Sequence, residues 1–282
     1  MQIIQSIKDM QSYSEARRRQ QQRVAVVPTM GYLHEGHLSL VRLAKEHADT
    51  VIVTVFVNPT QFGPTEDYKT YPRDMERDVK LVTSAGADCV YAPTPEEMYP
   101  EGHQTAVRVD KLTRHLCGIT RPTHFEGVTT VVTKLFNATK PHLAVFGEKD
   151  FQQLQVIRRM VRDLDVDIEI IGAPIVREPD GLAMSSRNKY LSAQERTAAL
   201  VLSRSLFEIR DMCAQGECDA LKLSRHVWQT ISAEPLAKID YIKVCDLETL
   251  EDVSHIRRDA VAALAVFFGK TRLIDNIVLK TA

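Results

Sequence analysis

Short apolar runs rich in β-branched residues alternate with amphipathic stretches over the first two thirds of the chain. The runs at 23–27 (RVAVV) and 50–57 (TVIVTVFV) are almost wholly apolar, which is typical of strands buried on both faces of a parallel sheet. The stretch between them, HLSLVRLAKEHA, has apolar residues at helical spacing. This order predicts a strand, helix, strand unit with a right-handed crossover.

The same alternation continues toward residue 175. A charged amphipathic stretch near 73–85 precedes the strand-like run DCVYAP. The run HLAVFGEKD is then followed by a helical pattern, FQQLQVIRRMVRDL, and by the strand-like run IEIIGAP. We therefore predict an α/β fold, a Rossmann-like doubly wound parallel sheet, over residues 1–175.

The pattern changes after residue 176. Residues 193–233 are mostly helical in pattern, and the strand-like runs DYIKVCD, VAALAVFF and RLIDNIVL follow. A chain of 282 residues is also long enough for two domains. We predict a second, smaller α+β domain over residues 176–282.

Charge and composition argue against nucleic acid and membrane as partners of this protein. The formal net charge of -1 argues against a general affinity for nucleic acid. The longest apolar run, VAALAVFF, is far shorter than the roughly 20 residues of a membrane-spanning helix. The five cysteines do not follow a zinc pattern, and the N-terminal stretch lacks a signal sequence. These features predict a cytoplasmic protein that binds neither membrane nor nucleic acid.

Polar loops follow three of the predicted strands. They are PTMGYLHEGH after the first run, NPTQFG after the second and GEKDFQQ after a later one. In open parallel sheets, ligands bind beyond the carboxyl ends of the strands. We expect the three loops to meet on one rim of the sheet.

His34 and His37, three positions apart in the first loop, admit three interpretations. A zinc site is disfavoured because the helical zinc motif spaces its histidines four apart and no third ligand is evident. Two partly buried histidines at the start of a helix are a second possibility. Phosphate binding is favoured, because Gly31 and Gly36 let a ligand approach the backbone where helix N–H groups and the helix dipole attract anions. Imidazoles there can donate hydrogen bonds to phosphate oxygens.

The H-x-G-H sequence resembles the signature of nucleotidyltransferases related to class I aminoacyl-tRNA synthetases. With FVNPTQF, YPR, RPTHFEGV, FGEKDFQQ and GLAMSSRN in order, nearly the whole chain resembles the pantothenate synthetase (pantoate–β-alanine ligase) family. The resemblance implies ATP-dependent ligation of pantoate and β-alanine through a pantoyl adenylate, with release of AMP and pyrophosphate, in pantothenate and coenzyme A biosynthesis. It also implies Mg²⁺, with no protein ligand assigned, and a homodimer.

The family motifs assign roles to matching residues of this chain. His34, His37, Lys149 and Arg187 are implied as catalytic groups that act on the phosphates. The segment Met184–Arg187 resembles a mobile loop that closes over them, and the alternative is an ordinary turn after Gly181. Residues 176–282 are therefore expected to act as a lid. The implied ATP-binding set is Met30, Gly31, His34, Gly36, His37, Gly147, Glu148, Lys149, Asp150, Val176, Met184, Ser185, Ser186 and Arg187.

Neutral amide side chains suit the hydroxyls and carboxylate of pantoate. The resemblance assigns pantoate binding to Gln61, Gln153, Met30 and Asn58, and contact with β-alanine to Gln61 as well. Arg121 matches the family and is expected to help close the site. The chain departs from the family's usual residues at Thr60, Phe151 and Cys117.

Two other functions compete with the ligase. One is a nucleotidyltransferase of the same fold that acts on a different acceptor. The other is a nucleotide-binding module without catalysis. Dependence of AMP formation on β-alanine would distinguish the ligase from the nucleotidyltransferase. Absence of pyrophosphate release would favour the noncatalytic module.

Overall fold

The computed structural model describes residues 1–64 and 66–281, which form two compact units. The first unit contains Met1–Asp110, Arg121–Glu148 and Gln153–Pro174, and the second contains Lys111–Thr120, Lys149–Gln152 and Ile175–Ala282. The chain thus passes between the units more often than a single boundary near residue 176 predicts.

The side chain of Gln152 joins the two early segments of the second unit to each other. Its amide nitrogen donates to the carbonyls of Leu112 and His115, at 2.9 and 2.7 Å. Its oxygen accepts from the backbone of Cys117 at 2.9 Å. Because Gln152 is buried, these bonds tie residues 111–120 to residues 149–152.

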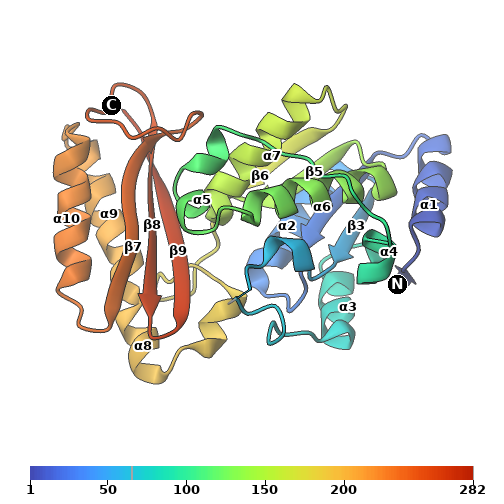
Figure 1. The fold of residues 1–282 in the computed structure, drawn as a ribbon, viewed down its shortest axis with the longest axis horizontal. Coiled ribbons are helices and arrows are strands. Elements are labelled where there is room, and N and C mark those ends of the chain that lie inside the picture. Colours follow the sequence, from blue (N-terminus) through green and yellow to red (C-terminus); the bar gives the residue numbers. More distant parts are fainter. Residues whose placement is uncertain (65, 282) are drawn as a thin grey trace. The chain divides into compact units, whose positions relative to one another are not determined.

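The first unit confirms the predicted α/β fold (Figure 1). Among the described residues its sheet has six parallel strands in the order β1-β4-β3-β2-β5-β6. They are β1 (Gln2–Ile4), β2 (Val24–Thr29), β3 (Thr50–Val55), β4 (Cys89–Tyr91), β5 (Leu143–Gly147) and β6 (Glu169–Ala173). The short β1 was not predicted.

Helices cover both faces of this sheet. The apolar side chains of α2 and α3 contribute to one core cluster, and those of α1, α6 and α7 contribute to the other. The helices of this part are α1 (Ile7–Arg19), α2 (Glu35–His47), α3 (Met75–Ser84), α4 (Pro95–Met98), α6 (His124–Thr139) and α7 (Phe151–Asp163), with the short 3-10 helix η1 (Pro59–Gln61). The 3-10 helix η3 (Glu148–Asp150) and the first two residues of α7 include the segment Lys149–Gln152, which belongs to the second unit.

The order of the strands reverses at β2. The chain runs from β2 through β3 to β4 toward one edge, and through β5 to β6 on the other side of β2. Such a reversal leaves a crevice beyond the carboxyl ends of β2 and β5, where open α/β sheets bind ligands. The histidine loop follows β2, and Gly147 ends β5.

The second unit confirms the predicted α+β character. Its described strands form a three-stranded antiparallel sheet in the order β7-β8-β9, and α9 and α10 pack against it through apolar side chains (Figure 1). The strands are β7 (Ala237–Asp246), β8 (Ala260–Phe268) and β9 (Thr271–Leu279). The helices are α5 (Cys117–Thr120), α8 (Ala193–Ala198), α9 (Leu200–Ala214) and α10 (Ala220–Ser232), with η2 (Leu112–Arg114) and η4 (Ser186–Tyr190).

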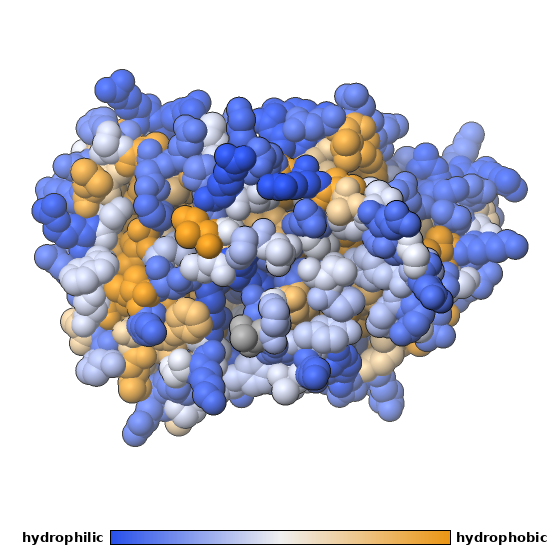
Figure 2. All heavy atoms as spheres, in the orientation of Figure 1, coloured by the Kyte–Doolittle hydropathy of each residue, from blue (hydrophilic) through white to orange (hydrophobic). Residues whose placement is uncertain are grey.

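The face of the molecule drawn in Figure 2 is mainly hydrophilic, and apolar side chains occupy smaller patches. Among the described residues, no helix combines the length and hydropathy that crossing a membrane requires.

Candidate active site

The histidine loop turns sharply after β2. Gly31 and Tyr32 both have left-handed backbone, with φ of 83° and 52°. A Cβ atom at Gly31 would lie 3.0 Å from Asp78 Oδ2 and from Val55 Cγ1. Position 31 therefore favours glycine for its conformation and for its space. The turn places His34 at the N-cap of α2 and His37 in its first turn.

The two histidines contact each other in a way that fixes one ring. The backbone N–H of His34 donates to Nδ1 of His37 at 3.3 Å, and the ring centroids are 4.0 Å apart. Because Nδ1 accepts, a neutral His37 carries its proton on Nε2. That N–H can donate to a ligand beside the N-terminus of α2, where backbone N–H groups also attract anions.

Asp78 of α3 holds the backbone of this loop. Its carboxylate is 1% exposed and accepts the N–H groups of Tyr32 and Leu33 at 2.6 and 2.8 Å. Burial raises the pKa of Asp78, and the two hydrogen bonds oppose that shift. Arg77 donates to the Leu33 carbonyl at 2.9 Å. Asp78 was not predicted as a site residue, although its spacing of four residues from Val82 indicates that both lie on the buried face of α3.

Three of the four predicted pantoate residues lie together in the first unit. Asn58 is buried and donates to Gln61 Oε1 at 3.1 Å. Gln61 Nε2 lies 3.2 Å from the sulfur of Met30. The fourth, Gln153, is partly exposed on α7, and its role stays a prediction.

The segment that carries Gln61 packs closely on α6. A Cβ atom at Gly127 would lie 2.4 Å from the Thr60 carbonyl oxygen, so only glycine permits this approach. Asn58 also donates to the Gly127 carbonyl at 3.1 Å. Thr60, where the chain departs from the family, has its hydroxyl 3.0 Å from Asn58 Oδ1 and therefore supports the amide cluster.

Arg121 holds the backbone of Gln61. Its guanidinium makes two hydrogen bonds of 2.6 Å to Glu66 and a longer one, 3.3 Å, to the Gln61 carbonyl. His124 Nδ1 lies 2.9 Å from the same carbonyl. Burial raises the pKa of Glu66, but Arg121, the Gly63 backbone and His124 together lower the pKa below its ordinary value. The contacts give Arg121 a structural role beside Gln61.

The second unit contains the other predicted phosphate-binding groups. Val176 and Met184 are paired, because Met184 N–H donates to the Val176 carbonyl at 3.0 Å. They close a hairpin, residues 176–184, in which Arg177 bridges to Ala183. Ser185 follows and caps η4, with its hydroxyl accepting the N–H of Arg187 at 3.3 Å. Because the hairpin ends directly before Ser185, it sets the position of the segment that carries Ser185 and Arg187.

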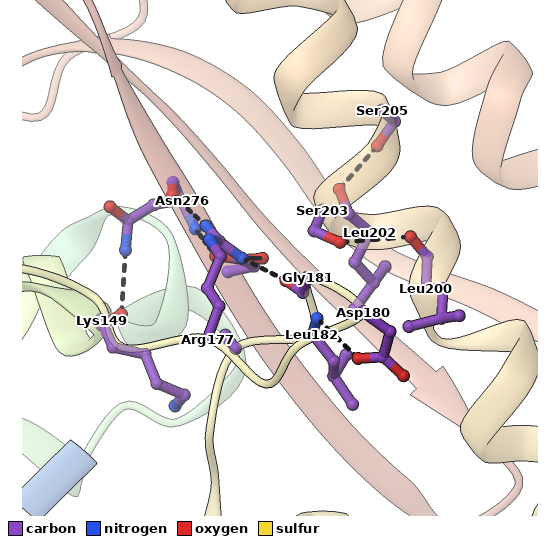
Figure 3. Close-up of polar contacts among 12 residues, drawn as sticks. Lys149, Arg177, Asp180, Gly181, Leu182, Leu200, Leu202, Ser203, Ser205 and Asn276 are labelled. Atoms are coloured by element: carbon purple, nitrogen blue, oxygen red, sulfur yellow. Dashed lines mark hydrogen bonds and ion pairs between the residues drawn. The ribbon is translucent and has the colours of Figure 1, made fainter. Parts of the chain in front are cut away.

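Lys149 lies in η3, before α7. Its ammonium group is 3.9 Å from Asp150 Oδ2, a distance at which the two charges attract but do not form a tight hydrogen bond. Its carbonyl accepts the side-chain N–H of Asn276 at 2.9 Å (Figure 3). The Lys149 backbone is thus anchored while its ammonium group remains available for a ligand.

Comparison with known proteins extends over the whole chain. The family model described as Pantoate-beta-alanine ligase matches residues 2–278. The chain is 56% identical to the pantothenate synthetase of Geobacter sulfurreducens over 279 residues, 99% of either chain. It is 51% identical to that of Acetivibrio thermocellus over 280 residues, 99% of this chain and all of the relative.

Solved structures of the same family also match this chain. The pantothenate synthetase of Thermus thermophilus superimposes with a TM-score of 0.93 at 46% identity, over 98% of this chain and 99% of that one. The pantoate–β-alanine ligase of Francisella tularensis, solved with beta-gamma ATP and β-alanine, gives 0.79 at 34% identity, over 100% and 99%. The chain therefore belongs to the pantoate–β-alanine ligase family and is an ATP-dependent ligase.

Proposed function

We propose that the chain joins pantoate to β-alanine through a pantoyl adenylate, releasing AMP and pyrophosphate and forming pantothenate. The observation that carries this assignment is the histidine pair at the N-terminus of α2, beside the reversal point of a parallel sheet. A relative with the same fold is described in complex with beta-gamma ATP and β-alanine. Both findings favour adenylation chemistry over a structural role for the histidines.

In the first step, a pantoate carboxylate oxygen attacks the α-phosphorus of ATP in line. A new P–O bond forms, and the bond to the β-phosphate breaks with its electron pair going to pyrophosphate. The His37 Nε2–H, His34 and the start of α2 stabilise the charge that develops on pyrophosphate. Lys149 and Arg187 supply positive charge to the same phosphates.

Pantoate is oriented by neutral groups. The amides of Asn58 and Gln61 bind its hydroxyls and carboxylate, and Met30 contacts its methyl groups. Gln153 completes this set. In the second step the β-alanine amine, near Gln61, attacks the acyl carbon and forms the C–N bond. AMP leaves with the electrons of the C–O bond, and the proton lost by the amine passes to water. Holding both reactants in place supplies much of the acceleration.

The remaining predicted residues bind the nucleotide. Gly31 and Gly36 leave its phosphates room beside the backbone, and Asp150 suits a ribose hydroxyl. Residues 176–282 act as a lid in which Ser185 and Ser186 cover the phosphates and keep water from the adenylate. Gly147, Glu148, Val176 and Met184 line the nucleotide site.

Magnesium accompanies ATP in this proposal. Among residues 1–64 and 66–281, no three His, Cys, Asp or Glu side chains gather as a metal site. The described side chains therefore do not fit a magnesium ion held by the protein alone, and we assign the ion no protein ligand and no step. Phosphate oxygens and water are its natural ligands. A homodimer in the cytoplasm is part of the same proposal.

Product analysis tests the reaction. The protein is incubated with ATP and Mg²⁺, with pantoate and β-alanine each present or omitted, and AMP, pyrophosphate and the amide are quantified. We expect AMP and amide in equal amounts when both substrates are present. If the steady-state rate of AMP formation is the same with and without β-alanine, a transferase with another acceptor is favoured. If no pyrophosphate forms under any condition, a noncatalytic module is favoured.

A further inference from the structure

Two adjacent polar residues lie in the apolar strand β9. Asp275 and Asn276 are 3% and 4% exposed, and they interrupt the run RLIDNIVL, in which the neighbouring residues are apolar. Aspartate and asparagine are disfavoured in strands, and a buried polar group needs a partner. The partners of this pair therefore indicate what the pair does.

The two side chains point to opposite faces of the sheet. The pairing of β9 with β8 is regular from Thr271 to Leu279, so successive side chains alternate. Asp275 shares its face with Leu273 and Leu279, which belong to the core beneath α9 and α10. Asn276 shares the other face with Arg272, whose guanidinium lies 3.5 Å from the Cys117 sulfur.

Asp275 holds the base of the hairpin that precedes Ser185. Its two oxygens accept hydrogen bonds from the Arg177 guanidinium at 2.7 and 2.9 Å. Arg177 also donates to the Gly181 carbonyl across the same hairpin at 3.1 Å. This planar, two-point contact fixes both distance and direction, which a single hydrogen bond would not do.

Asn276 holds the other phosphate-binding segment. Its Nδ2 donates to the Lys149 carbonyl at 2.9 Å, and Figure 3 shows Arg177 reaching the same strand from the hairpin. The segments of Lys149 and of Arg177 are far apart in sequence, yet both are fastened to one dipeptide. A rigid strand thus sets the spacing of two loops before any ligand arrives.

We infer that Asp275 and Asn276 are positioning residues for the adenylation step, holding Lys149 and the Ser185–Arg187 segment in a fixed arrangement within the second unit. The inference rests on the proposed function, because it takes Lys149 and Arg187 as phosphate-binding groups. Neither positioning residue touches substrate; each acts through the backbone or the side chain that it holds.

A double-mutant cycle tests the inference through pantoate-dependent ATP–pyrophosphate exchange. Asn276→Asp keeps the size of the side chain but replaces the donor to the Lys149 carbonyl with an acceptor. We expect kcat for exchange to fall roughly ten- to hundredfold, as small misplacements of reacting groups can cause. In Asn276→Ala, which removes the donor without adding repulsion, kcat for exchange should fall less.

Lys149→Ala completes the cycle. If Asn276 acts through Lys149, adding Asn276→Asp to Lys149→Ala should lower exchange no further. Multiplicative losses would overturn the inference, as would unchanged exchange in Asn276→Asp. If Lys149→Ala alone leaves exchange unchanged, the proposed role of Lys149 fails instead, which is a separate outcome.

Asp246→Asn is the matched control for general destabilisation of this unit. Asp246 is also buried, and it accepts the backbone N–H groups of Glu248 and Thr249 at 2.9 Å, but it holds a turn with no predicted ligand. Exchange should persist in this variant while its melting temperature falls. Equal losses of exchange in Asp246→Asn and Asn276→Asp, at equal melting temperatures, would show that Asn276 has a structural role only.

Discussion

Two buried carboxylates hold ligand loops in this molecule, and they do so with different partners. Asp78, in the first unit, accepts two neutral backbone N–H groups beside the histidine loop. Asp275, in the second unit, is paired through both oxygens with the charged Arg177. Their burial is nearly equal, at 1% and 3% exposure. The Arg77 guanidinium lies 3.7 Å from Asp78, beyond hydrogen-bond distance, so the two carboxylates differ mainly in whether the charged partner is hydrogen-bonded.

The difference lies in what remains after the carboxylate is removed. Without Asp275, a guanidinium whose side chain is only 17% exposed loses its counter-charge. Without Asp78, two neutral N–H groups lose an acceptor, and the unfavourable burial of a negative charge disappears as well. Arg77 loses a charge 3.7 Å away, but its side chain is 43% exposed and water can solvate it. Leaving a buried charge unpaired costs more stability than leaving neutral N–H groups without an acceptor.

The largest expected effect follows Asp275→Asn. We expect the free energy of unfolding to fall by about 2–4 kcal/mol, because Arg177 is left without a charge partner. Urea titration followed by circular dichroism measures this loss. The double variant Arg177→Met with Asp275→Leu should recover much of it. A double variant no more stable than Asp275→Asn would contradict the charge explanation.

Asp78→Asn should be milder, at about 1 kcal/mol, because an amide oxygen still accepts one N–H and the burial of charge is relieved. The loosened histidine loop should nevertheless raise the KM for ATP. Asp88→Asn is the matched control, since Asp88 also accepts a backbone N–H, that of Val51, but at the exposed surface. A loss in Asp78→Asn larger than in Asp275→Asn would reverse the comparison.

The smallest effect is a pH dependence of stability. Burial raises the pKa of Asp78 above its ordinary value of 3.8, so the folded state binds this proton more tightly than the unfolded state. The stability of the parent relative to Asp78→Asn should therefore increase as pH falls through the raised pKa toward 3.8. Urea titrations of both proteins at several pH values measure the difference. A relative stability that decreases over this range would contradict the assigned direction.

Much of the fold could be predicted because its signals are local. The apolar runs of β2 and β3 and the periodicity of α2 identify their elements without reference to the rest of the chain. Other elements could not be identified in this way, among them β1 and α6. The three residues of β1 form a strand only by pairing with β4, and α6 is rich in valine and threonine, so its helical state depends on packing.

The candidate site shows the same limit. Strand order is enough to bring the loops after β2 and β3 to one edge, and the structure then joins Met30 with Gln61. The residues that hold the loops were missed because their contacts are distant in sequence. Asp78 bonds to a residue 45 positions away, and Asp275 to one 98 positions away. Periodicity marks such residues as buried but does not name their partners.

The most direct test of the account separates the two half-reactions in His37→Ala and Lys149→Ala, with His47→Ala as a control on the exposed end of α2. We predict that the first two variants lose pantoate-dependent ATP–pyrophosphate exchange by at least roughly a hundredfold. Both should still convert added pantoyl adenylate and β-alanine to pantothenate, and His47→Ala should retain both activities. Exchange that persists in either His37→Ala or Lys149→Ala would contradict the claim that these groups stabilise the departing pyrophosphate.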